Sequence, residues 1–145
     1  MWDMSKNLGY AFDDDKYNRL VLLFEPTFAT YIDRLVQEKS ALFAGDRHFI
    51  GFYLDNELPF ASYQNADPLR GIDLKHFLSL PERYKAAREY AEKFMRDNGI
   101  ASTGVITKKN QEDFRGMVAD YYYQLTTATV RRYGDEHLIL GTRLH

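Results

Sequence analysis

The chain has 145 residues, the size of one ordinary domain, and its 45% hydrophobic and 15% aromatic content is typical of packed globular proteins. A formal net charge of −2 provides no basic field, so nucleic acid and anionic membranes are poor candidates as partners. Cysteine is absent, which excludes disulfides and cysteine-based metal sites.

The N-terminal region, residues 1–20, is predicted to be a polar, irregular lead-in without the apolar core of a secretory signal. No apolar run in the chain reaches the roughly 18 residues of a membrane span. The sequence leaves the localisation open. Leu20 to Phe24 is predicted to be a short strand or an extended lead-in, and Pro26 suits the first turn of a helix. That helix is predicted to end near Gly45, and its apolar positions are Phe28, Tyr31, Leu35, Leu42 and Phe43.

The rest of the chain alternates strands and helices. A strand is predicted over 49–56, a long loop over 58–80, a helix over 81–98 that Gly99 ends, and a helix from Asn110, as its cap, to about Tyr133. The apolar stripe of the helix over 81–98 is predicted to consist of Tyr84, Ala87, Ala91, Phe94 and Met95. The apolar side of the last helix is predicted to carry Phe114, Met117, Tyr121, Leu125 and Ala128. A second strand, 137–144, follows. Strands separated by helices indicate a parallel sheet of the βαβ type, and hence an α/β fold.

Both predicted strands become polar toward their carboxyl ends. Because side chains alternate along a strand, Gly51, Tyr53, Asp55 and Glu57 are expected on one face of "IGFYLDNELPF". Ile139, Gly141, Arg143 and His145 are the corresponding set in "HLILGTRLH". Parallel α/β folds carry their active sites at this end of the sheet, and a carboxylate beside a cation is a recurrent setting for acid–base chemistry.

The same residues also allow a purely structural interpretation. Polar residues at a strand end often mark its exit into solvent, and Asp55 with Arg143 is equally compatible with an ion pair in an unrelated α/β domain. Other kinds of site have less support. The four histidines show no metal-ligand spacing, and the sequence contains no glycine-rich phosphate loop and no nucleophile elbow, so no metal or cofactor is predicted.

The segments "HFIGFYLDNELPF" and "YGDEHLILGTRLH" together resemble clan A glycoside hydrolases, whose fourth barrel strand ends in Asn-Glu. They are most similar to beta-agarases of glycoside hydrolase family 50, and "LFEPTFATYIDRLV" resembles the helix entry of that family, with Glu25 where aspartate is usual. The resemblance covers about residues 22–145. It implies a partial (β/α)8 TIM barrel, from the third helix through the fifth strand, as a single segment of a catalytic domain. Another clan A activity, such as beta-galactosidase, remains an alternative.

The resemblance also implies roles for individual residues. Glu57 matches the general acid/base, and Asn56 matches the amide that contacts the 2-hydroxyl beside the cleaved bond, where hydrogen bonds strengthen in the transition state. Arg143 matches a rim residue that ends the fifth strand. Tyr53 and Asp55 are expected below Glu57 inside the barrel, where burial and a neighbouring charge raise the pKa of a proton donor. His145 and Phe60 complete the expected substrate contacts.

A retaining glycosidase needs a second carboxylate about 5 Å from the first, and a whole barrel needs about 200 residues or more. In the clan the nucleophile ends the seventh strand, which corresponds to no segment of this chain. A truncated product, one part of a split protein and a degenerate remnant are all compatible with this, and the first is favoured. We therefore expect a carbohydrate ligand but no glycosidase activity from this chain alone, and self-association through exposed sheet edges.

A non-catalytic carbohydrate-binding or assembly module is the main alternative. In that case Phe60, Tyr63 and the cluster Tyr121, Tyr122 and Tyr123 would supply the stacking surface for sugar, and Glu57 would be incidental.

Overall fold

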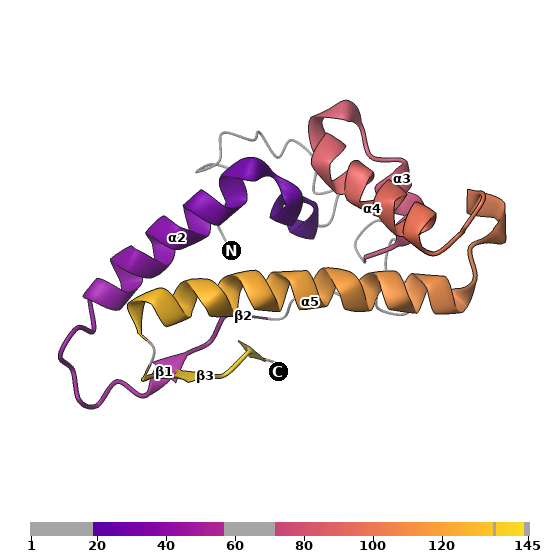
Figure 1. Ribbon diagram of the computed structural model, residues 1–145. Coiled ribbons are helices and arrows are strands. Elements are labelled where there is room, and N and C mark those ends of the chain that lie inside the picture. Colours follow the sequence, from indigo (N-terminus) through magenta and orange to yellow (C-terminus); the bar gives the residue numbers. More distant parts are fainter. Residues whose placement is uncertain (1–18, 57–71, 135, 144–145) are drawn as a thin grey trace. The chain divides into compact units, whose positions relative to one another are not determined.

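The computed structural model describes residues 19–56, 72–134 and 136–143, and these residues form two compact units (Figure 1). The first unit contains 26–56 and 121–143, with the parallel strands. The second contains 19–25 and 72–120 and is helical. Each unit is described by itself. The organisation of 1–145 as a single barrel segment remains a prediction.

The second unit begins with a 3₁₀ helix, η1 (Arg19–Phe24), so the prediction of a strand or extended segment there is wrong. Residues Leu20, Val21, Leu22 and Leu23 are all buried. A short apolar run of this kind fits a buried helical turn as well as a buried strand, because it has no periodicity that separates the two. Its turn closes with a hydrogen bond from the Glu25 amide to the Leu22 carbonyl, 3.0 Å long.

Helix α3 (Leu74–Leu78) lies inside the predicted long loop. Asp73 caps it, because its carboxylate accepts a hydrogen bond of 3.0 Å from the His76 amide. Phe77 on this helix makes edge-to-face contacts with Phe24 and Phe114, at centroid distances of 6.1 and 5.2 Å. These aromatic contacts join η1, α3 and α5 in the core of the second unit.

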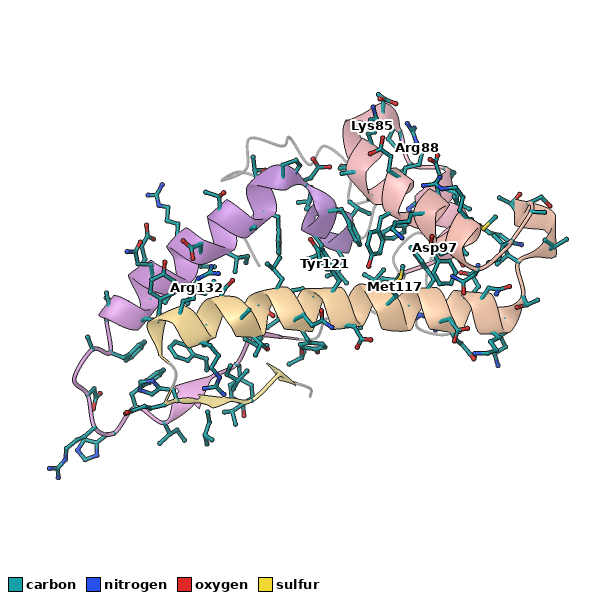
Figure 2. All side chains as sticks on the ribbon, viewed as in Figure 1. Lys85, Arg88, Asp97, Met117, Tyr121 and Arg132 are labelled. Carbon is teal, nitrogen blue, oxygen red and sulfur yellow. The ribbon has the colours of Figure 1, made fainter. Side chains whose placement is uncertain are left out.

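The helix predicted over 81–98 is confirmed as the 3₁₀ turn η3 (Glu82–Tyr84) followed by α4 (Lys85–Asp97). Its buried face consists of Tyr84, Ala87, Ala91 and Phe94, all four of them predicted apolar positions. Gly99 has a φ of +64° and ends the helix as expected. On the solvent side, Arg88, labelled in Figure 2, donates to the Glu82 carboxylate at 2.7 Å and to the Leu80 carbonyl at 3.1 Å. A further short 3₁₀ turn, η4 (Thr103–Val105), leads to α5.

Helix α5 (Lys108–Tyr133) begins with a reciprocal capping box. The Asn110 amide donates to the Thr107 hydroxyl at 3.1 Å, and the Thr107 amide donates to the Asn110 side chain at 2.9 Å. Thr107 is therefore the N-cap of α5, and Asn110, which was expected to be the cap, is its capping-box partner at the N3 position.

The predicted buried face of α5 is also wrong, apart from Phe114. Five buried residues recur every fourth position, Phe114, Val118, Tyr122, Thr126 and Val130, and Thr129 is buried beside them. Three of these six residues carry hydroxyl groups, so a search for apolar residues alone finds the neighbouring stripe instead. The Thr126 hydroxyl donates to the Tyr122 carbonyl at 2.7 Å, which allows a polar residue to occupy a buried position.

The first unit opens with helix α2 (Pro26–Ala41), which starts at the predicted proline and ends before Leu42 and Phe43. Phe28 is its buried residue, whereas Leu42 is exposed. The chain then turns through Gly45, at a φ of +80°, toward the first strand. Arg132, labelled in the last turn of α5 in Figure 2, forms a 2.5 Å ion pair with Asp33 of α2.

The predicted parallel pairing of the two strand segments is confirmed. Strand β1 (Gly51–Phe52) pairs with β3 (Leu138–Ile139), and β2 (Asp55–Asn56) pairs with β4 (Thr142–Arg143). Figure 1 shows β1 and β3 side by side. These two pairs contain all the strands in the described part of the chain. They give an α/β unit with a helical crossover, without a closed barrel among the described residues.

Backbone hydrogen bonds hold the pairing. The Leu138 and Leu140 amides donate to the carbonyls of Ile50 and Phe52, at 3.0 and 2.9 Å, and the Leu54 amide donates to the Gly141 carbonyl at 2.7 Å. Gly141 has a φ of +69°, a conformation that favours glycine, and the regular ladder is interrupted there. The predicted continuous strands are thus each divided into two short parts.

Gly51 allows the closest approach in this sheet. A Cβ atom at position 51 would lie 2.3 Å from the Leu138 carbonyl oxygen, which belongs to the backbone of the paired strand. A side chain is therefore incompatible with the observed pairing.

We predict that Gly51→Ala lowers the free energy of unfolding by about 1–3 kcal/mol, because the methyl group forces β1 and β3 apart. Gly116→Ala is the matched control, since a Cβ at that position on α5 meets nothing within 4 Å. The control should stabilise the chain by about 0.5–1 kcal/mol, as alanine is the better helix former. Urea unfolding of both variants measures the difference, and equal midpoints would contradict the close approach.

Candidate functional site

The carboxyl ends of β2 and β4 form the edge at which the sequence predicts a site. Asn56 pairs with Arg143 across the two strands, and Asp55 pairs with Thr142. Because β2 and β4 are parallel, the carboxyl ends of both strands lie at the same edge of the sheet. The residues on the two strand ends are therefore neighbours, although 87 positions separate them in the sequence.

The described structure covers the predicted site residues unevenly. Tyr53 and Asp55 are described in full, and Tyr53 is largely exposed. For Asn56 and Arg143 the description extends to their backbone pairing. The predicted residues Glu57, Phe60 and His145 lie outside the described residues, as does Tyr63. The catalytic and binding roles of these residues remain predictions.

Asp55 accepts a hydrogen bond from Tyr122 of α5, with 2.9 Å between the Tyr122 hydroxyl and the Asp55 Oδ2 atom. The same hydroxyl lies 3.4 Å from the Leu54 carbonyl oxygen. The Tyr122 side chain is 2% exposed, so its hydroxyl depends on protein acceptors rather than on bulk water. Burial, together with the negative charge and the hydrogen bond of Asp55, raises the pKa of Tyr122 well above its usual value.

The paired strand has a similar contact with the next residue of the helix. The hydroxyls of Tyr123 and Thr142 are 2.6 Å apart. The rings of Tyr122 and Tyr123 meet edge to face, with their centroids 5.3 Å apart. Two consecutive tyrosines of α5 thus bond to two adjacent strands, each within one residue of the predicted site positions.

These contacts correct the interpretation of the tyrosine cluster as a continuous sugar-stacking wall. Tyr122 is buried and bonded to Asp55, so its ring presents no surface to a ligand. Sequence analysis missed its role as a partner of the strand end. The four-residue spacing of Phe114, Val118 and Tyr122 is the pattern that indicates burial of Tyr122. A buried tyrosine in turn requires an acceptor for its hydroxyl.

Described residues of this unit line a cavity of about 820 Å³ at the amino-terminal side of β1 and β3, and its lining includes the stacked rings of Phe43 and Phe49, 4.3 Å apart. A smaller cavity, about 140 Å³, has a largely apolar lining from α2, the first strand and α5.

Within 19–56, 72–134 and 136–143, no three His, Asp or Glu side chains gather closely enough to hold a metal ion. Among the helices that the structure describes, none combines the length and apolar character needed to cross a bilayer.

No protein-family model matches the sequence, and no curated protein gives a significant match. A solved structure described as "Crystal structure of BpGH50" is similar over 99% of this chain, with a TM-score of 0.73 and 24% sequence identity. The chain has the fold of part of BpGH50. It spans 31% of the length of that protein. The suspected resemblance to glycoside hydrolase family 50 is supported at the level of the fold.

The raised pKa of Tyr122 predicts a loss of stability in alkali. The unfolded chain ionises this tyrosine near pH 10, whereas the folded chain keeps it protonated, so the folded state binds more protons above that pH. The free energy of unfolding should therefore be insensitive to Tyr122 below about pH 10 and should fall above it.

Urea unfolding at about pH 8 and about pH 10.5 measures this effect. The fall between the two should be smaller in Tyr122→Phe than in the unsubstituted chain, and Tyr31→Phe controls for the loss of one tyrosine hydroxyl from the same unit. A fall of the same size in Tyr122→Phe would exclude the proposed cause.

Proposed function

We propose that the chain is part of a retaining glycoside hydrolase barrel that acts on beta-galactosidic bonds of agarose-type carbohydrate. In this proposal the two parallel strands are the fourth and fifth of a (β/α)8 barrel, and their carboxyl ends form part of the sugar site. The observation that carries the proposal is the pairing of Asn56 with Arg143 at one edge, immediately before Glu57 in the sequence. The likeness in fold to BpGH50 supports it.

The proposed chemistry begins with Glu57 as the general acid. It protonates the oxygen of the leaving sugar while positive charge develops on the ring that is being cleaved. The Asn56 amide bonds to the 2-hydroxyl of that ring, and this bond strengthens as the charge develops. Arg143 lies on the neighbouring strand, where a cation helps to orient sugar hydroxyls and lowers the local density of negative charge.

A retaining reaction also requires a nucleophilic carboxylate about 5 Å from the acid. The proposal assigns this nucleophile to no residue of the chain. Binding and chemistry are therefore separable. The residues on the strand ends contribute to sugar binding, while formation and hydrolysis of a glycosyl-enzyme intermediate need the second carboxylate.

We predict binding of agaro-oligosaccharides without their hydrolysis. Asn56→Ala should weaken binding about tenfold, since it removes hydrogen bonds to a sugar hydroxyl worth about 1 kcal/mol or more. Glu112→Gln is the matched control, because Glu112 is an exposed residue of α5 in the second unit. Titration calorimetry measures affinity, and chromatography of the same mixtures detects products.

Two outcomes would contradict the proposal. Equal affinities of Asn56→Ala and the control variant would remove the sugar site from the strand ends. Hydrolysis that disappears in Glu57→Gln would show that the chain contains a complete catalytic pair. Binding that survives Glu57→Ala but is lost on substitution of Tyr53, an exposed aromatic residue, would favour the alternative of a non-catalytic binding module.

The exposed side of the sheet supports a second part of the proposal, which is self-association. Leu138 of β3 and its neighbours Ile50 and Leu140, which lie directly before β1 and after β3, have exposed apolar side chains, and unpaired strand edges tend to pair with further strands. We expect sedimentation velocity to show dimers or larger species whose fraction grows with concentration. Ile50→Lys should reduce this fraction, and Val105→Lys, at an exposed apolar residue of the second unit, should not. A concentration-independent monomer would contradict this part.

A further inference from the structure

The two strand ends are held by side chains of α5 as well as by each other. Tyr122 donates to Asp55 at 2.9 Å, directly before Asn56 on β2. Tyr123 bonds to Thr142 at 2.6 Å, directly before Arg143 on β4. All these residues belong to the first unit. One helix therefore fixes both strands at the last residue before the predicted site.

These contacts lie beyond the interruption of the strand at Gly141. The Leu138 and Leu140 amides hold the earlier part of the sheet by donating to Ile50 and Phe52. Gly141, with its positive φ, then separates β3 from β4. The pairing resumes between β2 and β4 for two residues in each strand. A pair of two-residue strands has little stability of its own, so additional restraints determine where its ends lie.

The direction of the Tyr122 bond is also fixed. An ionised carboxylate only accepts hydrogen bonds, so the tyrosine hydroxyl is the donor. Burial and the Asp55 charge keep the pKa of Tyr122 above its usual value, so the donor stays protonated at neutral pH. A bond between a buried donor and a carboxylate is stronger than one between two neutral groups.

We propose that Tyr122 and Tyr123 are positioning residues, which hold the ends of β2 and β4 so that Asn56 and Arg143 meet the sugar from one edge. The effect on sugar binding rests on the proposed function, whereas the two hydrogen bonds that restrain the strand ends are described contacts. Placement matters here because a displacement of about 1 Å in a binding or reacting group can cost about a hundredfold in rate.

Hydrogen exchange of individual amides, followed by NMR, tests the restraint directly. In Tyr122→Phe, the amides of Leu54 and Asn56 should exchange about tenfold faster, since the variant loses the hydroxyl that anchors β2. In Tyr123→Phe, the same acceleration should appear at one of the Thr142 and Arg143 amides, because consecutive amides of a strand point to opposite sides and only one of them faces β2. The amides of Leu138 and Leu140 should keep their rates in both variants, because their acceptors lie in the earlier part of the sheet.

Tyr31→Phe is the control, since it removes a tyrosine hydroxyl from α2 in the same unit and should accelerate neither strand end. Equal acceleration at all sheet amides would mean that the tyrosines support the fold in general, and unchanged rates would mean that they hold nothing. Either result overturns the inference. If Tyr122→Phe does not fold, Asp55→Ala removes the same bond from its other end, and the same amides decide.

The sugar titration separates this inference from the proposed function. If the unsubstituted chain binds agaro-oligosaccharides, both tyrosine variants should bind them at least about fivefold more weakly at a temperature where they are fully folded. Unchanged affinity would overturn the positioning role. If the unsubstituted chain binds none of them, the proposed function fails, and the exchange pattern still decides whether the tyrosines hold the strand ends.

Discussion

The parallel pairing of 51–56 with 138–143 is the constraint on which the rest of the first unit depends. Parallel strands cannot be joined by a tight turn, so the chain must cross from the end of one strand to the start of the other. Here the crossover includes α3, α4 and the whole of α5. Long-range pairing of this kind closes a large loop before it gains any contact energy, which is costly in chain entropy. The helices that pack within the crossover offset part of that cost.

The sequence predicted the elements whose signals are local. Helix α4 has an apolar stripe of regular spacing and a glycine at its end, and both were found where expected. The parallel pairing also followed from the order of strands and helices. Prediction failed where the local signal was ambiguous. The run from Leu20 to Leu23 is uniformly apolar, and no periodicity distinguishes a buried 3₁₀ helix from a buried strand.

The candidate site was predictable in its position but not in its supports. The polar ends of two strands indicated the edge where Asn56 and Arg143 now pair. The buried face of α5 could not be assigned from hydrophobicity, because it includes polar residues that are buried with hydrogen bonds. Tyr122 bonds to Asp55, which is far away in the sequence, and Thr126 bonds to the Tyr122 carbonyl one turn earlier. The partner of Tyr122 is Asp55, 67 residues earlier, and no local pattern connects the two.

The Asp55–Tyr122 bond bears on how this edge could serve a sugar. A carboxylate that already accepts a buried tyrosine hydroxyl is oriented by that bond, and rotation of its side chain would break the shorter of the two bonds given for the hydroxyl. Asp55 is thereby better suited to hold its strand than to change partners during a reaction. The proposed function assigns the ligand to the next residues in the sequence, Asn56 and Glu57. Within "LDNE" the proposal therefore separates Asp55, which is bonded to α5, from the two residues that it assigns to the sugar.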